Sequence, residues 1–107
     1  MAISRVIDYV SSTTELNSDL AQLCQIACVS ERTLQYAFKE RYGIPPIAFV
    51  KRWKLNVARR LLIQAEPKQT SISKVAMQLG FMHQGQFTTD YKNLFLELPS
   101  ETLGSQP

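Results

Sequence analysis

The sequence of 107 residues contains only two cysteines and one histidine, and it has no long uninterrupted apolar run. No stretch approaches the ~18 consecutive apolar residues of a membrane span, and the first residues lack the charged-then-apolar pattern of a secretory signal. A metal site needs roughly four ligands, which His83 and two cysteines do not supply. We therefore expect a soluble, cytoplasmic protein with no membrane partner, no metal and no cofactor.

Strand signals are also absent, because the apolar residues recur at helical spacing and the glycines and prolines fall where these patterns end. Ser30 is a candidate N-cap, and Gly43 can supply the left-handed residue that ends a helix. Pro46 suits the start of a long helix, and Pro67 prevents this helix from continuing. The sequence thus predicts an all-α fold of about seven helices. The residues expected to face the interior are Ile3, Val6, Ile7, Val10, Leu20, Leu23, Cys24, Ala27, Leu34, Ala37, Phe38, Tyr42, Ile47, Val50, either Trp53 or Lys54, Val57, Ala58, Leu61, Leu62, Ile72, Val75, Ala76, Leu79, Phe87, Tyr91, Leu94 and Phe95.

The two halves of the sequence repeat one pattern. Five residues recur 52 positions later: Leu20, Leu23, Ala27, Cys28 and Val29 return as Ile72, Val75, Leu79, Gly80 and Phe81. Five more recur 53 positions later: Leu34, Phe38, Lys39, Tyr42 and Pro46 return as Phe87, Tyr91, Lys92, Phe95 and Pro99. Each half therefore predicts a helix, a tight turn and a second helix. Within a single domain over residues 1–107, we expect these units at about 3–45 and 71–103, joined by a linker helix over 46–64.

Two short helices joined by a tight turn can place the second helix in the major groove of DNA. In the first half, Leu34 and Phe38 mark the buried side of that second helix. Its outward side then carries Arg32, Gln35, Tyr36 and Lys39. Arginine can pair with guanine, glutamine with adenine, and lysine neutralises phosphate. An ordinary polar helix face has the same spacing, so this stripe alone leaves both interpretations open.

The second half offers a weaker version of this face. Glutamine and threonine can read base edges, but the face has no arginine and Asp90 lies near it. We therefore expect weaker or more sequence-tolerant contact from this unit. Its outward residues are Gln84, Gly85, Gln86, Thr88, Thr89 and Lys92.

Positive charge is concentrated in the middle of the chain. Residues 30–62 carry eight basic and two acidic side chains, a net charge of +6, whereas the whole chain has +3. Such a block suggests a polyanionic partner, although a solvated helix face can also carry it. The linker helix, at ~1.5 Å per residue, is roughly 28 Å long. That length is near the ~34 Å between successive major-groove faces, so one monomer could engage two adjacent grooves.

These residues resemble the DNA-binding domain of the AraC/XylS family of bacterial transcription regulators, from about Ile3 to Leu103. The motifs that carry the resemblance are Ala27-Cys28-Val29-Ser30 with Leu34 and Phe38-Lys39, then Gly43-x-Pro45-Pro46, Ala58-Arg59-Arg60-Leu61-Leu62, Val75-Ala76-x-x-Leu79-Gly80-Phe81, and Phe87-x-x-x-Tyr91-Lys92. The sequence departs from the family pattern at Gly85, where serine is common, at Thr89, where arginine is common, at Leu96, where glycine is expected, and at Leu103, where arginine often ends the motif.

The resemblance implies sequence-specific binding to double-stranded DNA and transcription regulation, with RNA polymerase as a further partner. Base contacts are implied for Arg32, Gln35, Tyr36, Gln84, Gln86 and Thr89. Phosphate contacts are expected from Ser30, Thr33, Lys39, Lys51, Arg52, Thr88 and Lys92. Family members usually carry an additional effector or dimerisation domain. The sequence does not contain one, so we expect either a C-terminal fragment or a member that works as a single domain.

Two other functions compete with this interpretation. Cys24 near basic residues could serve a thiol-based enzyme or acceptor acting on DNA. However, free cysteines are usually buried, and helical neighbours four positions apart rarely form a disulfide. We therefore expect Cys24 and Cys28 to be small buried residues, with no catalytic role and no enzymatic activity. Alternatively, the basic linker face could bind an acidic protein partner.

Overall fold

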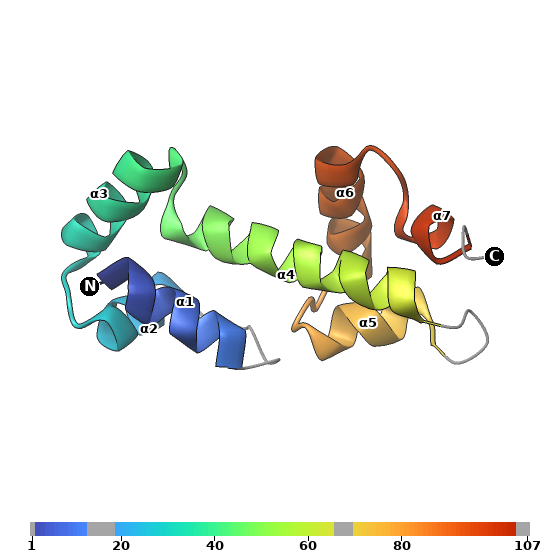
Figure 1. Cartoon of the computed structure of the whole chain (residues 1–107), viewed down its shortest axis with the longest axis horizontal. Coiled ribbons are helices and arrows are strands. Elements are labelled where there is room, and N and C mark those ends of the chain that lie inside the picture. Colours follow the sequence, from blue (N-terminus) through green and yellow to red (C-terminus); the bar gives the residue numbers. More distant parts are fainter. Residues whose placement is uncertain (1, 13–18, 66–69, 105–107) are drawn as a thin grey trace. The chain divides into compact units, whose positions relative to one another are not determined.

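The computed structural model describes residues 2–12, 19–65 and 70–104. Within these ranges the chain forms seven α-helices and no strand, which confirms the predicted all-α fold (Figure 1). The helices are α1 (Ala2–Ser12), α2 (Leu20–Ala27), α3 (Glu31–Tyr42), α4 (Pro46–Gln64), α5 (Ile72–Gln78), α6 (Gln84–Phe95) and α7 (Pro99–Gly104). Pro67, the expected stop signal after α4, lies outside the described residues.

Two compact units divide the chain between Trp53 and Lys54, a boundary that falls inside α4. In the first unit, α1, α2 and α3 contact one another in every pairing. Arg5 Nη1 on α1 donates a 3.2 Å hydrogen bond to the carbonyl oxygen of Ala27, the last residue of α2. The apolar side chains of these helices and of the first turns of α4 form one core. Its buried members are Val6, Val10, Leu23, Ala27, Leu34, Phe38 and Val50.

The second unit has its own core, in which α5, α6 and α7 contact one another. Inside it, the hydroxyl of Tyr91 lies 2.7 Å from that of Thr102, and the Thr102 hydroxyl donates in turn to a carboxylate oxygen of Glu97. The hydroxyl groups of Tyr91 and Thr102 are thus satisfied inside this core. Its buried apolar members are Leu55, Ala58, Leu62, Val75, Ala76, Leu79, Phe87 and Tyr91.

The repeat seen in the sequence recurs in the backbone hydrogen bonds of the two turns. The amide of Val29 donates to the carbonyl of Cys24 at 3.2 Å, and Phe81 donates to Ala76 at 2.9 Å, 52 positions further on. Helices α3 and α6 end alike, since the amides of Gly43 and Leu96 donate at 2.8 Å to the carbonyls of Lys39 and Lys92. These closures satisfy carbonyls that a helix end would otherwise leave unpaired.

Side-chain caps begin three of the four helices in the repeat. Asp19 and Ser71 occupy equivalent positions, and their side chains accept hydrogen bonds from the amides of Gln22 and Lys74. The Ser30 hydroxyl accepts from the Thr33 amide at 3.2 Å, which confirms the predicted cap of α3. His83 stands at the same repeat position before α6, and its side chain makes no capping bond. Serine fits this role because its oxygen reaches the free amides of the first turn.

Three expectations about burial are wrong. Cys28 is exposed, because it follows α2 as a left-handed residue that directs its side chain off the helix face. Ile47 is 39% exposed because Pro46, beside it in the first turn of α4, occupies the buried position. Tyr42, the last residue of α3, is 36% exposed because its ring packs by stacking on Phe49, at a centroid distance of 4.6 Å, and does not enter the buried core.

Candidate nucleic-acid interface

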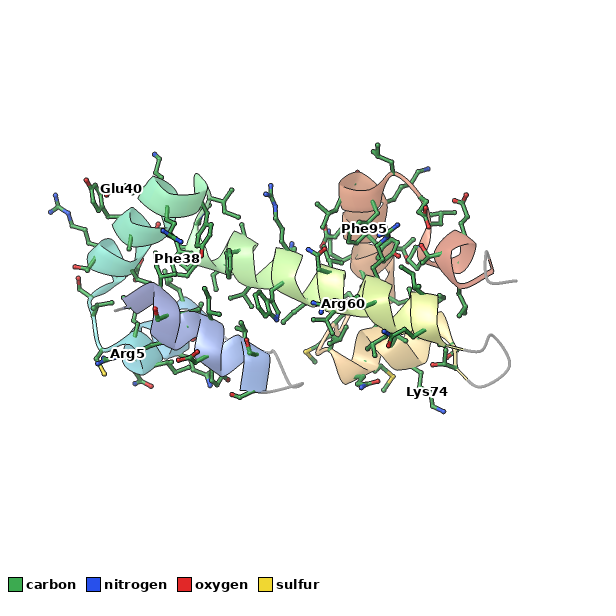
Figure 2. The ribbon with its side chains drawn as sticks, in the orientation of Figure 1. Arg5, Phe38, Glu40, Arg60, Lys74 and Phe95 are labelled. Carbon is green, nitrogen blue, oxygen red and sulfur yellow. The ribbon has the colours of Figure 1, made fainter. Side chains whose placement is uncertain are left out.

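The outward side of α3 is a polar face defined by Arg32, Gln35, Tyr36 and Lys39, all exposed. It has this composition because Leu34 and Phe38 turn the opposite side into the core, where both are 0% exposed. Figure 2 labels Phe38 on this helix together with Glu40, which is exposed.

Three members of this polar face also line one hollow. Gln35, Tyr36 and Lys39 surround it together with Gly43 and Pro45, and its volume is about 370 Å³. Tyr36 is 70% exposed, so most of its side chain is open to solvent. The side chains of Arg32, Tyr36 and Lys39 make no hydrogen bond or ion pair with any residue in the described part of the chain. They are therefore available to an external partner.

Ser30 and Thr33, both expected at phosphates, contact each other at the start of α3. The Ser30 hydroxyl donates to the Thr33 hydroxyl at 2.9 Å while it accepts from the Thr33 amide. The helix cap therefore fixes the position of both hydroxyl groups. Lys51 and Arg52 follow on α4 and are exposed.

The outward side of α6 differs, because each of its expected base-reading side chains already has a partner. Gln84 lies 2.9 Å from the hydroxyl of Ser73 on α5, and Gln86 donates to Asp90 at 2.9 Å. The Thr89 hydroxyl donates to the carbonyl of Gly85 at 3.0 Å. Lys92 is exposed, and Thr88 is half-buried. An external partner would have to share or displace these bonds, which costs part of what it gains.

Gly85 departs from the family pattern without a steric reason. A side chain built there would meet nothing within 4 Å, so serine would fit. The departure therefore removes a possible polar contact from α6 and leaves its packing unaffected.

Sequence reasoning did not identify the residues that hold the glutamines. Gln35 Nε2 donates to Glu31 Oε1 at 3.3 Å, which is the same kind of pair as Gln86 with Asp90. The signal was present in the sequence, because residues four apart on a helix are neighbours. Ser73, the partner of Gln84, comes from another helix and left no such signal.

Two of the eight basic residues between positions 30 and 62, Lys54 and Arg59, are half-buried in the second unit. The Nζ of Lys54 lies 5.5 Å from the ring centre of Phe81, and the guanidinium carbon of Arg59 lies 5.2 Å from the ring centre of Phe95. These contacts are cation–π interactions. Six of the eight basic residues remain exposed: Arg32, Lys39, Arg41, Lys51, Arg52 and Arg60.

Cys24 is a poor candidate for a nucleophile. It is half-buried against the first core, and both cysteines are free thiols. Burial, and secondly the Glu31 carboxylate, raise the pKa of the Cys24 thiol, which disfavours the reactive thiolate. The described residues contain no group of three His, Cys, Asp or Glu side chains able to hold a metal, and none of their helices is long and apolar enough to cross a membrane.

Comparison with known proteins gives this face a context. The family model "Helix-turn-helix domain" matches residues 23–105. The chain is 33% identical over 99 residues to the XylDLEGF operon transcriptional activator 2 of Pseudomonas putida, covering 92% of this chain and 63% of that protein. It is 32% identical over 101 residues to a probable thc operon regulatory protein of Rhodococcus erythropolis, covering 94% of this chain and 30% of that protein. The chain thus spans less than two thirds of the length of these relatives.

Solved structures agree over nearly the whole chain. A probable AraC family transcriptional regulator from Rhodopseudomonas palustris is 31% identical with a TM-score of 0.84, covering 99% of this chain and 98% of that one. The DNA-binding domain of AdpA, solved in complex with a target DNA, has the same fold, with a TM-score of 0.83 at 20% identity over 95% of this chain and 89% of that one. This chain belongs to the AraC family of helix-turn-helix DNA-binding domains.

Proposed function

We propose that this chain binds double-stranded DNA sequence-specifically and regulates transcription, with α3 and α6 as reader helices in the major groove. The observation that carries the proposal is the polar face of α3. Arg32, Tyr36 and Lys39 are exposed there without a described partner, above an apolar side that is fully buried. A rigid helix that presents such groups matches the size of the groove and the chemistry of its base edges.

The two reader helices have different roles in this proposal. On α3, Arg32 pairs with a guanine, while Gln35 and Tyr36 contact neighbouring bases. On α6, the base contacts come from Gln84, Gln86 and Thr89, whose side chains must share their existing hydrogen bonds. The first unit, assigned to residues 3–45, therefore supplies most of the discrimination, and the second, assigned to 71–103, reads more tolerantly.

Phosphate contacts position the protein on the duplex without reading sequence. We assign this role to Lys39 and Lys92 on the reader helices, to Lys51 and Arg52 on the linker helix 46–64, and to the hydroxyls of Ser30, Thr33 and Thr88. Binding then releases counterions, so affinity falls as salt rises. RNA polymerase is the partner that such a regulator would influence, and the cytoplasm is where a bacterium keeps both.

Selection from a random pool of duplexes tests the proposal. The chain should enrich a bipartite motif with centres ~10 base pairs apart, one half sharply defined and the other more variable. Recovery of unselected sequence at every position, together with tight capture of an acidic protein by the basic surface, would instead support the interaction-module alternative.

A further inference from the structure

Each reader helix holds one glutamine against a carboxylate one turn away. Gln35 Nε2 lies 3.3 Å from Glu31 Oε1, and Gln86 Nε2 lies 2.9 Å from Asp90 Oδ1. The order of the two residues along the chain is opposite in the two helices. The chemistry is the same in both.

A carboxylate fixes which end of the amide faces it. An ionised carboxylate only accepts hydrogen bonds, so the amide nitrogen must turn toward it and the amide oxygen away. Gln84 has no such constraint, because its partner Ser73 offers a hydroxyl that both donates and accepts. Orientation is therefore imposed on Gln35 and Gln86, and not on Gln84.

The orientation determines what the amide can read. A free glutamine pairs with adenine by accepting from N6 and donating to N7. When one N–H of the amide is held by a carboxylate, the orientation of the amide is fixed and its oxygen is presented outward beside the second N–H. That oxygen needs a base that donates. In the major groove, adenine and cytosine present amino groups, whereas guanine O6 and thymine O4 are acceptors that repel the amide oxygen.

We propose that Glu31 and Asp90 are positioning residues that commit Gln35 and Gln86 to bases bearing an amino group, adenine or cytosine. This inference rests on the proposed DNA-binding function. The commitment is stronger on α6, because the Gln86 bond is shorter and Asp90 is half-buried with Oδ2 shielded from solvent. Glu31 and Gln35 are both exposed, and their bond is longer.

Two isosteric variants test the proposal, Asp90→Asn and Glu31→Gln. Either new amide can donate or accept, so it no longer dictates the orientation of the glutamine. Removal of a negative charge raises affinity for any DNA, and therefore the measurement is base preference rather than affinity. In the random-pool selection, the position that loses its preference in Gln86→Ala identifies the base read by Gln86.

At that position we expect the parent chain to select adenine or cytosine. Asp90→Asn should admit guanine or thymine, with the affinity ratio between amino and carbonyl bases falling about tenfold. In the Gln86→Ala background, Asp90→Asn should leave base frequencies unchanged, because Asp90 acts through Gln86. Glu31→Gln should act likewise through Gln35, with a smaller effect.

Three results would overturn the inference. The single variants could select the same bases as the parent, the parent could prefer guanine or thymine at both positions, or the effect of Asp90→Asn could persist without Gln86. A parent chain that enriches no sequence at all would refute the proposed function itself. Circular dichroism of each variant confirms that the helices remain folded.

Discussion

Cys28 and Gly80 lie 52 positions apart and share a left-handed backbone, with φ of 60° and 83°. Gly43 and Leu96, 53 positions apart, form a second such pair with φ of 75° and 63°. These four residues are the described positions with positive φ in the turns and helix ends of the repeat. In each pair only one member is a glycine. Each unit therefore contains one residue with a side chain in the left-handed conformation, which is unfavourable for any residue other than glycine.

Replacement of Leu96 by glycine should stabilise the second unit. The left-handed conformation costs a residue with a side chain about 1–2 kcal/mol, and Leu96 is 86% exposed, so little packing is lost. Part of the gain is offset by the greater freedom of glycine in the unfolded chain, which leaves about 0.5–1 kcal/mol. Urea denaturation measures the change. Gly43→Ala is the matched control, and it should destabilise by a similar amount; a stabilising Gly43→Ala would refute this reasoning.

Substitutions of Ser30 separate its two assigned roles. Ser30→Ala removes the cap of α3 and should cost about 1 kcal/mol of folding free energy. Ser30→Asp keeps a capping oxygen and should retain parental stability, but its negative charge faces the assigned phosphate. DNA titration should then show that Ser30→Asp lowers the affinity for DNA at least about tenfold. If Ser30→Asp binds DNA as the parent does, Ser30 does not lie near phosphate.

Tyr91→Phe should destabilise the second unit by about 1–2 kcal/mol, because it leaves the buried Thr102 hydroxyl without its 2.7 Å partner. The loss is measured by urea denaturation followed by circular dichroism. Tyr36→Phe is the control, since Tyr36 is 70% exposed and its hydroxyl has no described partner. Equal stability of Tyr91→Phe and the parent would show that the buried bond contributes nothing.

Alkaline pH should weaken the fold through the same tyrosine. Burial is the largest cause and raises the pKa of Tyr91 above its ordinary value of 10.0. The hydrogen bond to Thr102 and the positive charge of Arg59 lower it, the Glu97 carboxylate raises it, and the net shift is upward. Above about pH 10 the unfolded chain loses this proton while the folded chain keeps it, so unfolding releases a proton and becomes easier as pH rises. The decline in unfolding free energy from pH 9 to 11 should be shallower for Tyr91→Phe than for Tyr36→Phe. Parallel declines would contradict this assignment.

The elements of the fold could be predicted because they depend on local and periodic signals. Leu34 and Phe38 set the buried side of α3, and Gly43 set its end. Contacts between helices could not be predicted in this way. The half-burial of Arg59 against Phe95 depends on how α4 packs beside α6 within the second unit, which no spacing in the sequence states. Sequence reasoning therefore overestimated the exposed positive charge of the linker.

The sequence predicted which residues of α3 face outward in the candidate interface, but it did not predict the hydrogen-bond partners of the interface residues. The outward residues of α3 follow from helical spacing alone. The partners of Gln35, Gln84 and Gln86 depend on side-chain rotamers, which the pattern of apolar and polar residues does not determine.

The central claim is that the exposed side of α3 reads bases, and Arg32 and Lys39 test it together. Both variants, Arg32→Ala and Lys39→Ala, would be titrated against the selected site and a shuffled duplex at several salt concentrations. Arg32→Ala should cost about 1–3 kcal/mol on the selected site and much less on the shuffled one. Lys39→Ala should weaken binding to both duplexes alike. It should also reduce, by about one, the slope of the logarithm of the binding constant against the logarithm of salt concentration. Parental affinity of Arg32→Ala for the selected site would contradict the account.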